Sequence, residues 1–553
     1  MMNKITNYLN EKFLIITALG LLAFFVGYII YVNFSYYWDF LHSDIVSDLS
    51  FIREAASNFS LFPDGWSHLN EMRFIYVTTP AILFYWITGN VHLAYSLAVS
   101  FMLIINVALF YYMLSYKKRS IFAIIIGAIV FLMFFSKYDI FSVFSILFIN
   151  GTLSTHLATV FLTIGVYMRI KHKADEGFKF QKALWVITLL LAFAQGIQST
   201  RMAVVLYAPL LLVEVLAIFR SVKGENYKIK WAGITYAVIA FSLNGLGLIL
   251  RNLLIANGTV VLEASGLTLG SNLASTGLFA ERIIEMLTTV FYTFGLVGGV
   301  NLFSAAGLAF VIRVCFIITI IYIYRNLKKD SVDQNLVQLL TSIVIFSALS
   351  QAIISMGMGQ RFNFVAPSFM AVIFVISLGN MIESLRNSIK DKEDATKELI
   401  SYHRLQKSLI GSLVIIVIMG SFLSINTLGT TRNPGLVEDR QRIADFLKEE
   451  NLTIGYGSFW QGHVITGVAN WEVVVIPFRA NMGVTGRPLR QGVSYSDFYH
   501  DEDRVFLIAS TTQITSAYDH YRVRPILEEG ERHDFPGAWV VYIFEENPWA
   551  EMK

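Results

Sequence analysis

Long apolar runs separated by short basic segments make up most of this sequence. A run of about 20 apolar residues is long enough to cross the hydrocarbon core of a bilayer as a helix. Threading such runs between the basic segments predicts about eleven membrane-spanning helices, and hence an all-α polytopic membrane bundle. The predicted ranges are 13–32, 92–114, 121–135, 151–168, 183–197, 201–219, 232–256, 302–324, 336–356, 363–382 and 408–426.

The basic segments predict the orientation of this bundle, because cytoplasmic loops of membrane proteins are enriched in Lys and Arg. These segments lie at 117–119, 169–173, 220–230, 325–329 and 386–407. The first apolar run is long enough to span and is followed by no small-residue cleavage site, so we expect it to stay as an uncleaved helix. With the N-terminus in the cytoplasm, an odd number of spans then places the C-terminal region outside.

Two large loops fall on the outer side in this topology, at 33–91 and 257–301. Each contains an apolar stretch, Ile75–Thr88 in the first loop and Met286–Val300 in the second. Adding either stretch alone as a span would invert the basic loops. Both are therefore predicted to be helices that lie at the outer surface of the membrane or enter it partway.

The pattern changes after Thr427, where apolar and polar residues begin to alternate as in a soluble α/β domain. Glu438–Glu450 has the spacing of an amphipathic helix, and Glu472–Phe478, Arg504–Ala509 and Ala538–Phe544 are predicted strands. We therefore expect a transmembrane module at 1–426 and an extracytoplasmic α/β domain at 427–553.

The composition agrees with a membrane protein and narrows the function classes. The chain is 55% hydrophobic and 15% charged, with a mean hydropathy of +0.57, whereas soluble domains carry about 25% charged residues. A net charge of +3 is too small to indicate nucleic acid binding. The single cysteine, Cys315, excludes an intramolecular disulfide framework and a thiolate metal site.

Acidic residues cluster in the first outer loop, just after the first apolar run. Asp44 and Asp48 are spaced i,i+4, so a helix would present both carboxylates on one face. Such a pair can raise the pKa of one member, share a divalent metal ion, or supply a general base to an acceptor hydroxyl. The alternative is a solvated loop in which Asp44 only caps a helix, and Asp39 is expected to be interfacial beside Trp38.

Other polar residues fall at predicted outer helix ends. They are His156, Arg201, Arg251 and Arg361. Each has a structural alternative, because an arginine at a helix end commonly reaches toward lipid phosphate and a lone histidine is more often a hydrogen-bonded structural residue. Acids and guanidinium groups together at a bilayer-facing cleft nevertheless suit a phosphate-bearing lipid substrate.

The order of residues in the first outer loop forms a motif. Asp44 precedes Arg53-Glu54, Pro63 follows, and the apolar segment Pro80–Trp86 ends in Tyr-Trp. This order and the Asp-to-Arg-Glu interval resemble the GT-C superfamily of polytopic glycosyltransferases, which includes protein O-mannosyltransferases and lipid A aminoarabinose transferases. The chain departs from the bacterial pattern at three positions, with Ile45 in place of an acid, Asp48 in place of a tyrosine and Ile52 in place of a small residue.

Two further segments are similar to elements of such proteins. Arg361 to Pro367 is similar to an Arg-Tyr-x-x-Pro element, with looser spacing, and Ile454–Gly462 is similar to a Gly-Tyr-x-x-x-Trp pattern. The overall architecture of the superfamily is also similar, with a large first outer loop, seven core spans and another long outer loop.

The resemblance implies an inverting glycosyltransferase of the plasma membrane that uses a polyprenyl-phosphate sugar such as an undecaprenyl-phosphate hexose. Asp44 takes the place of the catalytic aspartate, with Asp48 as a helper. Arg201, Arg361 and Arg251, with His156 nearby, would stabilise the donor phosphate. No nucleotide cofactor is expected, and a divalent metal ion remains open because the departures leave its ligands undefined.

The acceptor is left open by the sequence. A cell-wall or other surface glycan, a lipid-linked saccharide and a protein all fit, and the C-terminal domain would help to select among them. Two other functions remain as alternatives. A transporter or flippase for a lipid-linked saccharide would require acids or broken helices deep in the spans and inverted repeats, which the sequence does not show. A surface polysaccharide polymerase would share the donor chemistry but not the Asp44 pattern.

Overall fold

The computed structural model describes the chain in segments. They are residues 2–63, 66–68, 71–133, 145–172, 181–222, 229–262, 284, 303, 305–326, 331–354, 364–390, 411, 415, 417–420, 434–459, 462–478, 504–518 and 524–549. The chain divides into two compact units. The first unit consists of Met1–Val32, Val99–Arg251 and Thr268–Thr431, and the second of Asn33–Ala98, Asn252–Leu267 and Arg432–Lys553.

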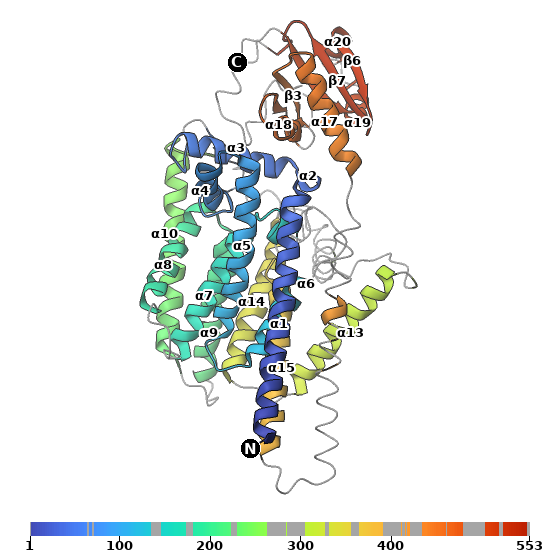
Figure 1. Cartoon of the computed structure of the whole chain (residues 1–553). Helices are drawn as coiled ribbons and strands as arrows, with labels where there is room; N and C mark the ends of the chain where they lie inside the picture. Colours follow the sequence, from blue (N-terminus) through green and yellow to red (C-terminus); the bar gives the residue numbers. More distant parts are fainter. Residues whose placement is uncertain are drawn as a thin grey trace. The chain divides into compact units, whose positions relative to one another are not determined.

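The first unit is built of long apolar helices, several of which run along one another in Figure 1. The described helices that lie wholly or mainly in this unit are α1 (Met2–Ser35), α5 (Val91–Leu114), α6 (Ile121–Met133), α7 (Ser154–His172), α8 (Gln181–Gln198), α9 (Ala208–Val222), α10 (Trp231–Ala256), α13 (Ala305–Asn326), α14 (Ser331–Ile354) and α15 (Ala366–Lys390). Two short π-helices, η1 (Ser145–Ile149) and η2 (Ala203–Tyr207), adjoin α7 and α9.

Six of the described helical segments are long and apolar enough to cross a membrane. They are Lys12–Ser35, Val91–Leu114, Ala203–Val222, Trp231–Ala256, Val332–Leu349 and Ala366–Ser384. The predicted total of about eleven spans is therefore not confirmed. Of the predicted span 121–135, the structure describes the 13 residues of α6, and most of 408–426 lies outside the described residues.

Helices α8 and α10 pack closely because glycines remove the side chains between them. Cβ atoms added to Gly196 and Gly247 would each lie 2.1 Å from a backbone oxygen of the facing helix. Toward the other end of the pair, Tyr236 donates a hydrogen bond to Thr188 Oγ1 at 2.8 Å. The paired positions increase together along both helices, so α8 and α10 run parallel and their C-terminal ends lie at the same end of this unit.

Buried charges collect toward the opposite end of the same unit. Lys171, in the last turn of α7, lies 3.0 Å from the Glu214 carboxylate of α9, and both side chains are buried. Tyr167 donates a hydrogen bond to the same carboxylate. Gly233 of α10 packs against Glu214, where a Cβ would lie 2.6 Å from the carboxylate oxygen. An ion pair with further hydrogen bonds is the form in which charges tolerate burial.

The second unit begins with three helices from the predicted first outer loop. They are α2 (Tyr37–Phe40), α3 (Ser43–Ser57) and α4 (Thr78–Thr88). Helix α4 matches the predicted surface helix 75–88 and ends at Gly89, whose φ of 65° lies in the left-handed region that terminates helices. Its Leu83, Trp86 and Ile87 are exposed. The predicted helix Met286–Val300 lies outside the described residues.

A short parallel pairing joins the two predicted outer loops. Strand β1 (Ser67–His68) pairs with β2 (Val261–Leu262), in the register Ser67 to Val261 and His68 to Leu262. Residues nearly two hundred positions apart in sequence thus belong to one unit. The side of the membrane on which these two loops lie stays a prediction.

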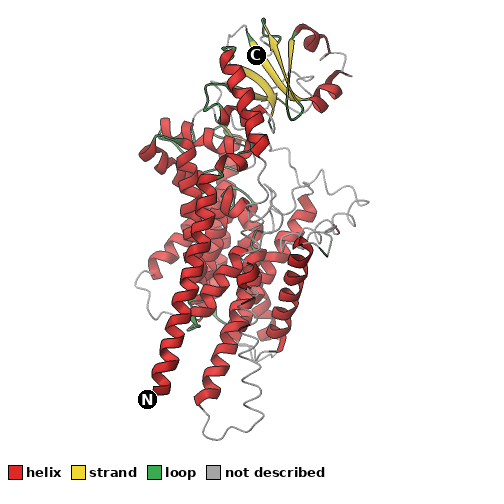
Figure 2. Ribbon diagram, turned by 45° about the vertical axis from the view of Figure 1, so that its right-hand side comes forward, coloured by secondary structure: helices red, strands yellow, loops and turns green. Residues whose placement is uncertain are grey.

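The C-terminal part of the second unit contains a five-stranded sheet with the order β4-β3-β5-β7-β6 (Figure 2). The strands are β3 (Ile454–Ser458), β4 (Val474–Phe478), β5 (Val505–Ser510), β6 (Glu531–Phe535) and β7 (Trp539–Phe544). Strands β4, β3 and β5 are parallel, whereas β7 is antiparallel to β5 and β6. The sequence patterns identified β4, β5 and β7 and missed β3 and the mainly exposed edge strand β6.

Helices α17 (Pro434–Glu449), α18 (Gly462–Val468), α19 (Thr511–Tyr518) and α20 (Arg524–Glu529) accompany this sheet. Helix α18 also packs against α3, because Gly467 leaves room for Val46, whose Cγ2 would lie 2.6 Å from an added Cβ. Arg440 of α17 donates a hydrogen bond to the Leu41 carbonyl at 2.8 Å. The first outer loop therefore packs against the helices that accompany the C-terminal sheet.

Candidate functional site

The two predicted carboxylates lie on α3, one helical turn apart. Asp44 is in the first turn, where a negative charge is stabilised by the helix dipole, and His42 occupies the N-cap position without a side-chain capping bond. Asp44 is half-buried, whereas Asp48 is fully buried. The structure thus gives the predicted pair a common helix face and unequal access to solvent.

Asp48 is held by a buried polar cluster. Arg73 forms an ion pair with its Oδ1 atom and donates a second hydrogen bond to Ser47 Oγ at 3.2 Å. Tyr95 of α5 donates its hydroxyl to Asp48 Oδ2 at 3.2 Å. Arg73 is only 8% exposed. Both carboxylate oxygens of Asp48 therefore have partners, which fixes the side chain in one position.

The pKa of Asp48 is raised from 3.8 to about 7: burial raises it most and the Asp44 carboxylate also raises it, whereas Arg73 and the Tyr95 hydroxyl lower it. Loss of water around the carboxylate therefore outweighs the favourable interaction with Arg73. A carboxylate in this state exchanges a proton near neutral pH, which is a property of functional carboxylates.

A third titratable group comes from the C-terminal sheet. His463, at the start of α18, interacts electrostatically with Asp44 and Arg73, and burial lowers its pKa to about 4. Its ring stacks on Phe459 with centroids 5.5 Å apart. The imidazole is therefore neutral at pH 7 and lies near the carboxylate pair without adding charge to it.

The sequence analysis missed Arg73, Tyr95 and His463. Arg73 could have been found, because it borders a long apolar and aromatic run and a charge there requires a partner when buried. Tyr95 and His463 carried no such indication. They reach the site only because α5 and α18 pack beside α3.

In the first unit, the structure places His156 in the first turn of α7, fully buried. Its Nε2 atom lies 3.1 Å from Nε2 of Gln198, the last residue of α8. Arg201 follows three residues later and is half-buried. The start of α7 and the junction between α8 and α9 therefore meet, and they bring His156 and Arg201 to the same end of the helical unit.

Arg251 belongs to the same end. It lies one turn after Gly247 on α10, and Gly247 packs against Gly196 near the end of the parallel helix α8. Arg361, the remaining predicted phosphate ligand, lies outside the described residues. Three of the four predicted phosphate-binding residues thus share one end of the first unit, while the carboxylates belong to the second unit.

A metal site is not defined by the described residues. No group of three or more His, Cys, Asp or Glu side chains lies close enough together in these ranges to hold an ion. Asp44 and Asp48 supply two carboxylates, and the ion pair with Arg73 already occupies an oxygen of Asp48.

A pocket of about 580 Å³ lies farther along α3, within the second unit. Its lining combines aromatic rings with polar side chains: Ser50, Arg53, Glu54, Ala56, Ser57, Trp66, Tyr85, Trp86, Trp471 and Val474. Three tryptophans from separate parts of the chain thus line one cavity. The motif residues Arg53 and Glu54 belong to this pocket.

Trp471 and Val474 are the residues of the C-terminal domain that line this pocket. Its indole N–H donates to Ser50 Oγ at 3.1 Å, and the Arg53 guanidinium lies 4.4 Å from its ring centroid. Trp471 has a φ of 63°. This conformation is costly for a bulky residue, on the order of 1–2 kcal/mol, and such positions cluster at functional sites.

Several solved structures match this chain, and three of them are compared with it below. ArnT from Cupriavidus metallidurans bound to undecaprenyl phosphate aligns over 96% of this chain and 99% of its own, with a TM-score of 0.56 and 12% identity. Its apo structure aligns over 95% and 98%, with a TM-score of 0.53 and 11% identity. The Archaeoglobus fulgidus oligosaccharyltransferase aligns over 90% and 69% with 13% identity, but its TM-score of 0.42 is below the level that indicates a shared fold.

No protein-family model and no curated protein sequence matches this chain. The similarity to ArnT extends over nearly the full length of both proteins, including the helical unit and the C-terminal sheet. The chain therefore shares the fold of ArnT.

Proposed function

We propose that this protein is a multi-pass plasma-membrane glycosyltransferase that moves a sugar from a polyprenyl-phosphate donor to an acceptor hydroxyl on the outer face, with inversion. The fold shared with ArnT supports this proposal, since an ArnT structure contains undecaprenyl phosphate. The observation that carries it is the carboxylate pair on α3, one member half-buried and the other enclosed. We further propose that the N-terminus lies in the cytoplasm and the C-terminal domain on the outer side of the membrane.

In the proposed reaction, Asp44 accepts the proton of the acceptor hydroxyl. The freed oxygen attacks C1 of the donor sugar from the face opposite the phosphate, while the bond between C1 and the phosphate oxygen breaks. The polyprenyl phosphate leaves with that electron pair, so the configuration at C1 inverts. Asp44 suits the base role because it is the more exposed carboxylate and can meet a substrate.

Asp48 is a positioning residue in this proposal. Its oxygens are engaged by Arg73 and Tyr95, so it does not reach a substrate. Because its pKa is about 7, it holds a proton for part of the time at neutral pH. Two neighbouring carboxylates whose environments differ in this way can take different roles in one reaction.

The leaving phosphate requires positive charge around it. Arg201 and Arg251, with His156 nearby, share one end of the first unit, and we assign to them the donor phosphate together with Arg361. Guanidinium groups bind phosphate oxygens with paired charge-assisted hydrogen bonds, and they stabilise the charge that develops as the C1–oxygen bond breaks.

We assign the acceptor to the aromatic pocket on α3. Sugar rings present apolar C–H faces that pack on indole rings and hydroxyls that bond to charged groups, and Trp66, Trp86 and Trp471 stand beside Arg53 and Glu54. A saccharide acceptor fits this lining better than a peptide. Residues from both the first outer loop and the C-terminal domain would then select the acceptor.

The test of the function is sugar transfer by the purified full-length protein from undecaprenyl-phosphate hexose. We expect Asp44→Asn to lower turnover by about 10²–10⁴-fold, because a lost general base costs this much. Asp39→Asn, a change of the same kind in the preceding helix α2, should retain turnover. Full turnover in Asp44→Asn would exclude it as the base, and lipid translocation without sugar release would favour the transporter alternative.

The acceptor assignment predicts a change in KM with little change in kcat. We expect Trp471→Leu to raise the KM for a saccharide acceptor about five- to ten-fold through the loss of an aromatic contact, and Trp471→Phe to restore most of it. The KM for the lipid donor should stay constant. Trp231→Leu, at an exposed tryptophan of α10, is the matched control. Equal acceptor KM values in wild type and Trp471→Leu would refute the assignment.

A further inference from the structure

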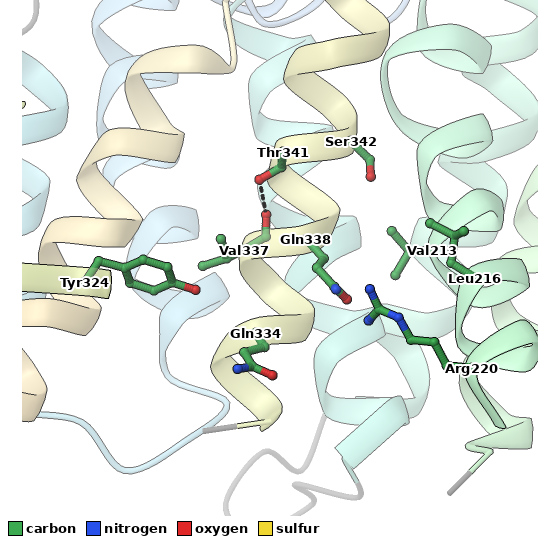
Figure 3. A pocket seen from close by; sticks show the side chains of 9 residues that line it. All are labelled: Val213, Leu216, Arg220, Tyr324, Gln334, Val337, Gln338, Thr341 and Ser342. Atoms are coloured by element: carbon green, nitrogen blue, oxygen red, sulfur yellow. Dashed lines mark hydrogen bonds between the residues drawn. The ribbon is translucent and has the colours of Figure 1, made fainter. Parts of the chain in front are cut away.

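A second cavity, of about 440 Å³, lies among the helices of the first unit (Figure 3). It is formed by α9, α13 and α14 near the end of the unit that holds the Lys171–Glu214 pair. Its lining residues are Val213, Leu216, Arg220, Tyr324, Gln334, Val337, Gln338, Thr341 and Ser342. The proposed transfer reaction uses none of them.

Helix α14 presents a stripe of polar side chains to this cavity. Gln334, Gln338 and Thr341 recur at intervals of four and three residues, so they share one face of the helix, and Ser342 adjoins Thr341. The helix belongs to a candidate membrane span with a mean hydropathy of 1.4, the lowest of the six. Uncharged amides and hydroxyls in a span are costly without partners, and they commonly mark a binding site or pathway.

Arg220 supplies a positive charge to the lining of the same cavity. Figure 3 shows its guanidinium extending from the last turn of α9 toward the Gln338 amide of α14. Among the described residues Arg220 has no acidic partner. Glu214 on the same helix is engaged by Lys171, and Asp333, at the start of α14, is engaged by Arg119 and Lys117.

The residues of α9 near Arg220 expose apolar side chains. Phe219 and Val222 are 60% and 77% exposed, and Leu216 is 44% exposed at the cavity itself. An exposed apolar surface of this kind on a membrane helix contacts lipid chains. The cavity thus joins a cationic, amide-rich interior to a surface that suits acyl chains.

We propose that this cavity binds the phosphate group of an anionic phospholipid, with Arg220 as the charged ligand and Gln338 as a hydrogen-bond donor. Basic pockets between helices on the cytoplasmic side suit such headgroups. In the predicted topology the neighbouring basic segments 220–230 and 325–329 face the cytoplasm, so the lipid comes from the inner leaflet. The donor lipid of the transfer reaction is a separate ligand on the outer face.

Native mass spectrometry of the full-length protein, after incubation with phosphatidylglycerol, tests this site. Arg220→Gln should retain about ten-fold less phosphatidylglycerol than wild type, because it removes a charge-assisted contact. Arg325→Gln is the matched control, since Arg325 lies in the last turn of the neighbouring helix α13 but does not line the cavity. Gln338→Leu, which keeps Arg220, should retain an intermediate amount.

Two further binding measurements distinguish an anionic phospholipid from free phosphate as the ligand. Phosphatidylcholine, whose headgroup has no net charge, should be retained less than phosphatidylglycerol, and inorganic phosphate at millimolar concentration should not displace bound phosphatidylglycerol. Displacement by inorganic phosphate would identify a free-phosphate site and overturn the lipid assignment. Equal phosphatidylglycerol retention in wild type, Arg220→Gln and Arg325→Gln would overturn the site itself.

Discussion

Asp44 and Asp48 show how far two like residues on one helix can differ. Their i,i+4 spacing predicted a shared face, and α3 provides it. The spacing did not indicate that Asp48 would be enclosed by Arg73 and Tyr95 while Asp44 stayed half-buried. Those partners come from residues 25 and 47 positions away, so the difference between the two carboxylates could not be read from the local sequence.

The raised pKa of Asp48 predicts a pH-dependent stability. The folded protein holds a proton on Asp48 up to about pH 7, whereas the unfolded chain releases it near its ordinary value of 3.8. A raised folded-state pKa adds stability that is complete below the unfolded value and is lost as pH rises through about 7. Wild type should therefore lose on the order of 2–3 kcal/mol between about pH 5 and about pH 8, relative to Asp48→Asn.

Thermal unfolding of both proteins across this pH range measures the difference. Asp48→Asn is the appropriate reference because its amide fills the same space without titrating. A constant difference in unfolding temperature at all pH values would show that Asp48 stays ionised in its pair with Arg73.

The helical unit depends on close contacts between elements, and α8 with α10 is the clearest case. Gly196 and Gly247 bring the two backbones together, and the same contact sets the positions of Arg201 and Arg251 at the helix ends. Apolar periodicity predicted both helices well, because lipid and core both select apolar residues. It did not predict that they run side by side, which depends on where small residues face one another.

This contact predicts a difference between two glycines of one helix. Gly247→Ala would place a Cβ 2.1 Å from the Phe193 carbonyl oxygen, so we expect a loss of about 3 kcal/mol or more, since backbone cannot move aside cheaply. Gly245→Ala meets nothing within 4 Å and should be neutral or stabilising, because alanine favours helix. Thermal unfolding in detergent compares the two, and equal unfolding temperatures would contradict the packing.

At the scale of the whole molecule, the division of the chain into units does not follow the sequence order. The first outer loop and the C-terminal sheet belong to one compact unit, although about 330 residues lie between them. Hydrogen bonds from Arg440 to the Leu41 carbonyl and from Trp471 to Ser50 join them. The sequence predicted that both parts lie on the outer side of the membrane. Two segments can contact each other in this way only if they lie on the same side.

A cysteine pair tests this union directly. Because Val46 packs on Gly467, Val46→Cys with Gly467→Cys, in a Cys315→Ser background, should form a disulfide in most of the purified protein. Val46→Cys with Thr466→Cys is the control, since Thr466 faces Val475 instead, with its hydroxyl 2.8 Å from that backbone nitrogen. Non-reducing electrophoresis detects the cross-link, and equal yields in both pairs would contradict the assignment.

The sequence by itself determined the features that depend on local composition and period. These are the apolar helices, the position of the C-terminal sheet domain and the carboxylate helix with its GT-C motif. The tertiary structure alone decided which carboxylate is buried, that Arg73 and His463 lie beside the pair, and that Trp471 completes the aromatic pocket. The physical reason is that burial, desolvation and charge pairing are set by contacts between residues distant in sequence, and no local pattern encodes them.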